Sequence, residues 1–481
     1  MSLPQRRRFW VKVMLHLLRR LVDSREANVA VIFALMMIPT IFLLGMALDY
    51  TQAVRKREQL DAAADAAAIA AVRPAMLTQT DATIVQATAA AVFAAKANLA
   101  GLSATPVPTI NVTDSGLQRT ITVSYTAQSI NNFPLVLGKQ TWPINGASTA
   151  RASSAPNMNF YLLLDDSPSM AIAATQNDIN NLITYTKNQP SGSANCGFAC
   201  HELNPSKDSG ASASTKDNLT IARANNVTLR IDLVANAVSQ LLVGPWSCPQ
   251  SGVSGGVMQC MSALNHTTYK AAIYTFDYGL NTIQALTSPT TAGTQISNIQ
   301  LLTVDHQNCV TTSNCGTDYG TDIAGALSGV NAIMPLPGGG TNQSGDTPQE
   351  VVFLVTDGLE DKLISSSTGC NALAALPLQK LGTKYRCQQS LDTTICDTIK
   401  NRNIRIAILY TEYLQLPTNS WYNSQIAQYN NPSSSSGQIA QRLRSCASPG
   451  LFADVQTGGD ISAALTNLFL KVASSTASLV Q

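Results

Sequence analysis

The sequence predicts an α/β protein with a parallel sheet and large loop insertions, preceded by a transmembrane helix and a small α+β module. Three observations lead to this prediction. An uncharged apolar run covers residues 29–48, apolar and polar residues alternate within 106–150, and short apolar runs alternate with helical stretches from residue 158 onward. Alternation of doubly buried strands with helices is typical of a parallel sheet covered on both faces.

The composition narrows the class of protein. A chain of 481 residues is long enough for two or more domains. Charged residues make up only 12% of it, about half of the usual globular share, so uncharged polar side chains must cover much of the surface. Such a surface is common in exported proteins. The net charge of +2 argues against a nucleic-acid partner.

The apolar run at residues 29–48, VAVIFALMMIPTIFLLGMAL, is long enough to cross a bilayer as a helix. Pro39 would kink the helix, which membrane helices tolerate. Arginines and lysines dominate residues 1–27, so we expect this basic tip in the cytoplasm, a membrane span at 28–48 and the remaining chain outside. A cleaved signal peptide is the alternative, although its apolar core is normally 7–15 residues long.

Residues 49–150 are expected to form the small module. The segment 49–72 is rich in alanine and lacks Gly and Pro, so one helix could run from the membrane through Val72. Residues 28–72 would then span roughly 65–70 Å. A second alanine-rich helix is predicted near 81–99. The alternating pattern and the turn signal Asp114-Ser115-Gly116 predict a β-hairpin within 106–150.

The remaining chain, 155–478, is expected to form the α/β domain. Its apolar runs at 159–164, 269–276, 351–356 and 404–410 predict buried strands. Helices are predicted near 221–243, 321–334, 390–402 and 459–472. The polar segments between these elements are long and are interpreted as surface insertions.

All ten cysteines lie at residue 196 or beyond. An even number in an exported region predicts disulfides. The neighbouring pairs are 196/200, 248/260, 309/315 and 370/387, which leaves Cys396 and Cys446. Buried free thiols are the alternative. Cys196, Cys200 and His201 also leave open a haem or a zinc site.

Three polar side chains follow the first predicted strand of the α/β domain. Asp165, Ser167 and Ser169 alternate along one loop, so their oxygens could face one centre. Hard oxygen ligands suit Mg²⁺ or Mn²⁺, and open α/β sheets bind ligands at the carboxyl ends of their strands. Thr321 opens a predicted helix and Asp357 ends the strand VVFLVT, so both are expected at the same edge.

The pattern Asp165-x-Ser167-x-Ser169, then Thr321, then Asp357 resembles the von Willebrand factor A domain with its metal-ion-dependent adhesion site. The resemblance implies that Ser167, Ser169 and Thr321 bind the metal directly. The two aspartates would act through water or complete the shell, and a partner's carboxylate would take the open position. Thr317, in a similar Gly-Thr-Asp, is the alternative to Thr321. Two other readings remain: these side chains merely cap turns, or the fold has lost its metal.

Residues 25–75 resemble the start of TadE/TadG-type proteins of Flp (tight-adherence) pilus assembly. An anchor of this type before a von Willebrand A domain is similar to TadG in layout. The resemblance implies a single-pass protein of the bacterial inner membrane, with a periplasmic C-terminal domain that binds pilus or envelope proteins. A surface adhesin and a metal-dependent hydrolase are the alternatives. No catalytic motif is readable, so we expect no enzyme.

Overall fold

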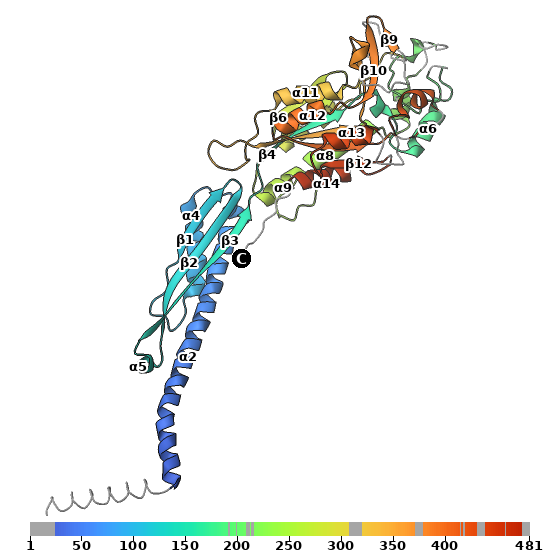
Figure 1. The fold of residues 1–481 in the computed structure, drawn as a ribbon. Helices are drawn as coiled ribbons and strands as arrows, with labels where there is room; N and C mark the ends of the chain where they lie inside the picture. Colours follow the sequence, from blue (N-terminus) through green and yellow to red (C-terminus); the bar gives the residue numbers. More distant parts are fainter. Residues whose placement is uncertain are drawn as a thin grey trace, which may run out of the picture. The chain divides into compact units, whose positions relative to one another are not determined.

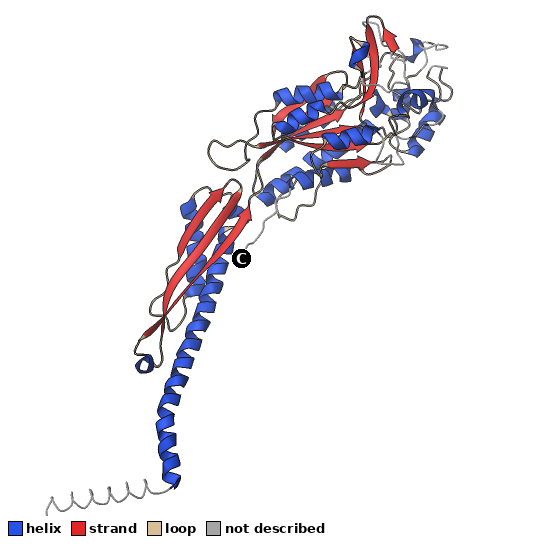
Figure 2. Ribbon diagram, viewed as in Figure 1, coloured by secondary structure: helices blue, strands red, loops and turns tan. Residues whose placement is uncertain are grey.

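A computed structural model describes residues 25–190, 193–198, 200–207, 212, 216–306, 320–370, 379–413, 415–416, 419–430, 438–456 and 458–473. The described chain forms two compact units that divide between Ala152 and Ser153. The first contains a long helix and a three-stranded sheet, and the second contains a six-stranded sheet with helices on both faces (Figures 1 and 2).

The first unit is built on α2 (Arg25–Ala71), a single helix of 47 residues. This agrees with the expected unbroken helix, and its apolar first part is long enough for a membrane anchor or a signal sequence. Its second part buries Leu60, Ala63 and Ala67 in a core shared with α4 (Ala82–Ala97). Alanines spaced by three or four residues lie on one face, which lets the two helices pack closely. The short α3 (Pro74–Leu77) connects them.

The sheet of the first unit has the order β1-β2-β3, with β1 at Thr109–Ser115, β2 at Gln118–Ile130 and β3 at Thr141–Ser153. The predicted hairpin is the antiparallel β1–β2 pair. Every second residue of β2 is buried, including Ile121 and Val123, so one face of the sheet covers the helices. The third strand and the short α5 (Pro134–Leu137) were not predicted.

The large sheet of the second unit has the order β12-β11-β7-β4-β5-β6. The four predicted strands are β4 (Met158–Asp165), β5 (Tyr269–Phe276), β7 (Gln349–Thr356) and β11 (Arg405–Thr411), and they are parallel. Two edge strands were not predicted: β6 (Leu280–Thr287), which is antiparallel to β5, and β12 (Phe452–Val455). In chain order the strands run 3-2-1-4-5-6, a doubly wound sheet whose order reverses between β4 and β7.

Helices cover both faces of this sheet (Figure 1). On one side lie α8 (Arg230–Leu242), α9 (Val257–Asn265) and α14 (Ile461–Ala473), and on the other lie α11 (Ile323–Ile333) and α12 (Thr394–Asn401). The prediction of one helix near 221–243 was wrong. The chain forms α7 (Asn218–Ala224) and α8, because Asn226 adopts a left-handed conformation with φ 54° between them.

The insertions contain structure that the sequence pattern missed. They hold α6 (Gln176–Thr186), α10 (Pro289–Gly293), α13 (Gln438–Cys446) and a second sheet made of β8 (Leu359–Ile364), β10 (Lys384–Ser390) and β9 (Gln379–Leu381). Disulfide formation is confirmed for the pairs 196–200, 248–260, 370–387 and 396–446. The predicted pair 309/315 lies outside the described residues. Because Cys196 and Cys200 are joined to each other, their sulfurs cannot hold haem or zinc.

Candidate functional site

The loop after β4 brings three of the predicted residues together. Asp165 is the last residue of β4, and its Oδ1 accepts a hydrogen bond from the backbone N–H of Ser167 at 3.1 Å. The hydroxyls of Ser167 and Ser169 lie 3.2 Å apart. All three residues are buried, with at most 8% of Ser169 exposed. The strand end and the following 3₁₀ turn (Pro168–Ala171) therefore direct a carboxylate and two hydroxyls to one place.

The end of β7 supplies the opposite side of the site. The Thr356 hydroxyl donates to Asp165 Oδ2 at 2.6 Å, and it accepts the N–H of Gly358 at 2.9 Å. Gly358 has φ 82°, and a Cβ there would meet the side chains of Ile439 and Leu443 within 2.6 Å. Only glycine fits this turn, which leaves Asp357 fully buried beside Asp165. Sequence reasoning missed Thr356, although it immediately precedes Asp357.

Two buried carboxylates therefore face each other across the reversal point of the sheet. Burial, and then the charge of Asp357, raise the pKa of Asp165 well above its ordinary value. Burial also raises the pKa of Asp357, while the Arg230 guanidinium opposes that shift. Both groups resist ionisation because burial disfavours their charged forms, and the nearby charge of Asp357 adds to this effect at Asp165. A positive ion between them would favour the ionised forms.

The Asp357 carboxylate is poorly satisfied. In the described part of the chain, neither of its oxygens has a hydrogen-bond partner of regular geometry. The hydroxyls of Ser169 and Tyr413 and the backbone N–H of Leu359 approach it and lower its pKa, without making such a bond. The Arg230 Nη1 atom lies 3.9 Å from Asp357 Oδ2, and it is also buried without a hydrogen bond. A buried carboxylate normally has its hydrogen bonds made, so this one is suited to an additional ligand.

Thr321 lies on a separate segment of the same edge. It is 4% exposed and forms a two-bond antiparallel bridge with Asp361 of β8, at 3.0 and 2.9 Å. Among the described residues, no hydrogen bond joins Thr321 to the other four predicted site residues. Thr321 and Ser169 instead line one cavity of about 380 Å³. The alternative residue, Thr317, lies outside the described residues.

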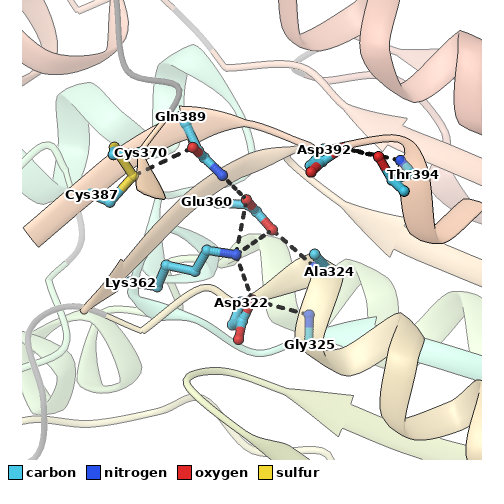
Figure 3. Close-up of polar contacts among 10 residues, drawn as sticks. All are labelled: Asp322, Ala324, Gly325, Glu360, Lys362, Cys370, Cys387, Gln389, Asp392 and Thr394. Carbon is cyan, nitrogen blue, oxygen red and sulfur yellow. Dashed lines mark hydrogen bonds and ion pairs between the residues drawn. A yellow bond between two sulfur atoms is a disulfide. The ribbon is translucent and has the colours of Figure 1, made fainter. Parts of the chain in front are cut away.

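A buried polar network holds the Thr321 segment in place (Figure 3). Glu360 of β8 is completely buried and accepts hydrogen bonds from the Ala324 N–H at 2.9 Å and from Gln389 Nε2 at 2.7 Å. Lys362 Nζ lies 3.2 Å from Glu360 Oε2 and donates to Asp322 Oδ1 at 2.9 Å. These contacts connect β8 to the start of α11, so they fix the loop that carries Thr321. The sequence pattern gave no sign of this network.

The cavity beside Ser169 and Thr321 is lined mainly by the insertions. One wall is the loop closed by the Cys196–Cys200 disulfide, and another contains Trp421 and Arg386. The Arg386 guanidinium lies 4.7 Å from the centre of the Trp421 ring and forms an ion pair with Asp361 at 2.5 Å. Arg386 is therefore already paired, and Glu202 and Asp361 line the same cavity, so its wall carries charges of both signs.

The residues present fit a divalent cation. Asp165, Ser167, Ser169 and Asp357 place two carboxylates and two hydroxyls around one point, and Thr321 reaches the adjoining cavity. Hard oxygen donors of this kind suit Mg²⁺ or Mn²⁺. The unsatisfied oxygens of Asp357 and the raised pKa values of both aspartates agree with a site that a cation would stabilise.

The comparisons with known proteins address the two parts of the chain separately. Residues 27–77 match the Tad family model, described as "Flp pilus-assembly TadE/G-like", which confirms the resemblance predicted for residues 25–75. Among curated proteins, none matches this chain.

Solved structures similar to this chain include several with a von Willebrand factor A domain. BatB from Bacteroides thetaiotaomicron is 11% identical, with a TM-score of 0.31, over 66% of this chain and 99% of that one. The vWF domain of the pilus tip protein Mfa5 from Porphyromonas gingivalis is 10% identical, with a TM-score of 0.31, over 66% and 96%. Proximal thread matrix protein 1 from the mussel byssus is 13% identical, with a TM-score of 0.27, over 67% and 48%. Similarity this distant says nothing about activity, and the fold is established by the strand order itself.

Proposed function

We propose that this chain is a membrane-anchored envelope protein of Flp pilus assembly that binds a protein partner through a divalent cation. The family match at residues 27–77 supports the pilus context. The observation that carries the binding function is the Asp357 carboxylate, which is fully buried beside Asp165 and, among the described residues, has no hydrogen bond of regular geometry at either oxygen. Such a group costs stability unless something pairs with it.

In this proposal, Ser167, Ser169 and Thr321 hold the cation and the two aspartates balance its charge. When bound, Mg²⁺ or Mn²⁺ supplies a coordination position for a carboxylate of a pilus or envelope protein. The cavity lined by Thr321 and Ser169 would admit that carboxylate. The site binds and positions a partner, and we assign it no catalytic step.

The apolar first part of α2 is the anchor in this proposal. We infer that it crosses the inner membrane once, with residues 1–27 in the cytoplasm and the α/β domain, residues 155–478, in the periplasm. The uncharged run 29–48 and the basic residues before it support this orientation. The module at 49–150 then lies directly outside the membrane.

The test is a calorimetric titration of Mg²⁺ and Mn²⁺ into the full chain in detergent. Loss of outer-shell groups alone weakens metal binding about 10–100-fold, so Ser167→Ala with Ser169→Ala is expected to weaken it by more than ~100-fold. Ser251→Ala with Ser254→Ala changes two exposed serines of the same unit and is expected to bind like the wild type. Equal affinities in the two double variants would show that the metal assignment is wrong.

A second experiment concerns the partner. Crosslinking in intact cells, with and without EDTA, is expected to capture pilus or envelope proteins only when divalent metal is present. Digestion of intact cells by an added protease separates the proposal from the alternative of a surface adhesin. Cleavage of the C-terminal domain in such cells would favour the adhesin.

A further inference from the structure

The connection between β2 and β3 carries an apolar tip at residues 133–137, Phe-Pro-Leu-Val-Leu, which includes α5. Leu135 is 95% exposed and Phe133 is 40% exposed. Leu135 is the most exposed large apolar side chain among the described residues. Phe133 and Leu135 together expose apolar surface at this tip, and exposed apolar patches mark sites of protein or membrane interaction.

The tip is fixed to α2 at a defined level. Asp49 is 2% exposed, and its carboxylate accepts the backbone N–H of Asn132 at 2.7 Å and that of Phe133 at 3.0 Å. The Phe133 ring lies against Gly45, where an added Cβ would approach the ring to 3.2 Å. These contacts hold the tip beside residues 45–49 of the helix (Figure 1).

That level coincides with the end of the uncharged run of α2. Leu44 and Leu48 are 60% and 52% exposed there, and Asp49 is the first charged residue after the run. Gly45 lies three residues before Leu48, roughly 5 Å along the helix. Tyr50 packs edge-to-face on Trp142 of β3, with ring centres 5.9 Å apart. Tyr and Trp side chains are enriched at the boundary between a bilayer and water.

We propose that residues 133–137 insert into the headgroup–acyl boundary of the periplasmic leaflet, so that the first unit is attached to the bilayer at two points. This inference depends on the proposed membrane crossing by α2. The occupant is the lipid surface, because the exposed side chains of Phe133 and Leu135 continue the apolar surface of the helix at the same level. Amphipathic segments commonly enter this zone by about 5–10 Å.

The test places an environment-sensitive fluorophore on the tip in the full chain. Leu135→Cys is labelled and reconstituted into phosphatidylethanolamine–phosphatidylglycerol vesicles without reductant, so that the disulfides persist. Leu43→Cys, on the apolar run, and Ser115→Cys, on the exposed turn at the far end of the β1–β2 hairpin, are labelled in parallel. The unsubstituted chain gives the labelling background. Leu135 is almost fully exposed, so its replacement is expected to leave the fold unchanged.

The expected result is that lipid-borne spin labels near the headgroup quench the Leu135 probe several-fold more than the Ser115 probe, while deep spin labels quench the Leu43 probe. If Leu43 is quenched but Leu135 behaves like Ser115, the tip is in water and this inference is wrong, although the membrane span stands. If Leu43 is not quenched, the span itself is wrong. The Leu135 probe could instead report an apolar environment only until the protein is diluted in lipid. That result would identify a second copy as the occupant and would also overturn the inference.

Discussion

Replacement of Arg230 by methionine is the sharpest available perturbation of the site. Arg230 is 3% exposed, and its guanidinium is the cation beside Asp357, with Nη1 3.9 Å from Oδ2. The same side chain donates from Nη2 to the Glu412 carbonyl and lies over the Tyr413 ring. Methionine keeps the apolar stem and removes the charge. The change therefore leaves Asp357 without a countercharge while preserving most of the packing.

The expected loss follows from the distance. Opposite unit charges 3.9 Å apart attract by about 4 kcal/mol at an effective dielectric constant of 20. Removal of one member of a buried ion pair typically costs about 3–5 kcal/mol. Asp357 could instead take up a proton, which costs about 4 kcal/mol at pH 7 for a carboxyl of ordinary pKa 3.8. We expect Arg230→Met to lower the free energy of unfolding of the second unit by about 4 kcal/mol at pH 7 in EDTA, and by less at pH 5.

Magnesium should reverse much of this loss. A ligand at one hundred times its dissociation constant stabilises the folded state by about 2.7 kcal/mol. In Arg230→Met the metal alone balances Asp357 and no longer competes with a guanidinium. Mg²⁺ should therefore raise the free energy of unfolding of this variant by more than it raises that of the wild type. The assay is urea unfolding of the full chain, with hydrogen exchange of the β4 and β7 amides reporting the second unit.

A matched variant separates this effect from general destabilisation. Arg402→Met removes hydrogen bonds to Asn331 and to the Met334 carbonyl, at the opposite end of α11 from Thr321. Arg402→Met should lower the free energy of unfolding, but Mg²⁺ should raise that free energy by the same amount as in the wild type. If Arg230→Met gains no more from Mg²⁺ than the wild type does, Arg230 and the cation do not share Asp357, and Asp357 is not part of the metal site.

Burial raises the pKa of Asp166 to about 7. Between pH 5 and 7 the folded state therefore keeps a proton that the unfolded state has lost, and the metal-free free energy of unfolding should fall as the pH rises through this range. Asp166→Asn should remove about 2 kcal/mol of that fall in urea unfolding. Glu360→Gln should cost about 2–3 kcal/mol and weaken Mg²⁺ binding in calorimetry, because the donors of Ala324, Lys362 and Gln389 lose their buried carboxylate. Removal of the disulfide between Cys396 and Cys446, which are 50 residues apart, should cost about 4 kcal/mol of unfolding free energy.

Each of these outcomes has a control in the second unit. Asp397→Asn changes a carboxylate whose side chain is 67% exposed, and it should leave both the pH dependence and Mg²⁺ binding unchanged. If Asp166→Asn behaves like Asp397→Asn, the folded state does not hold that proton. Unaltered Mg²⁺ affinity in Glu360→Gln would mean that the network does not position Thr321. Removal of the Cys196–Cys200 disulfide, which spans four residues, should cost less than removal of the longer one.

The sequence revealed the strands whose two faces are both buried. All eight residues of β4 are buried and six of them are apolar, which gives the strand a recognisable apolar run. The edge strand β6 has no fully buried residue, and β12 has only four residues, so neither gave a recognisable pattern. The break between α7 and α8 depends on a left-handed Asn226, which apolar periodicity does not report.

The predicted site residues were those carried by local motifs. Asp165, Ser167 and Ser169 lie within five residues of one another, so their convergence follows from one loop. Arg230 reaches Asp357 only because the fold places the start of α8 beside the end of β7. Gln389 donates a hydrogen bond to Glu360 because β8 and β10 pair in the sheet, although an insertion separates them along the chain. Pairs of this kind are created by tertiary packing and have no signature in a single segment.

The unbroken course of α2 has a mechanical consequence for the first unit. The same helix carries the apolar run and, one continuous backbone later, Leu60 and Ala63 of the core, so no hinge separates them. One residue inserted between these parts would turn the module by about 100° and lift it by about 1.5 Å. Seven inserted residues would restore its azimuth to within about 20° but raise it by about 10 Å. If α2 crosses the membrane as proposed, its length therefore sets both the height of the module above the bilayer and the direction in which the module faces.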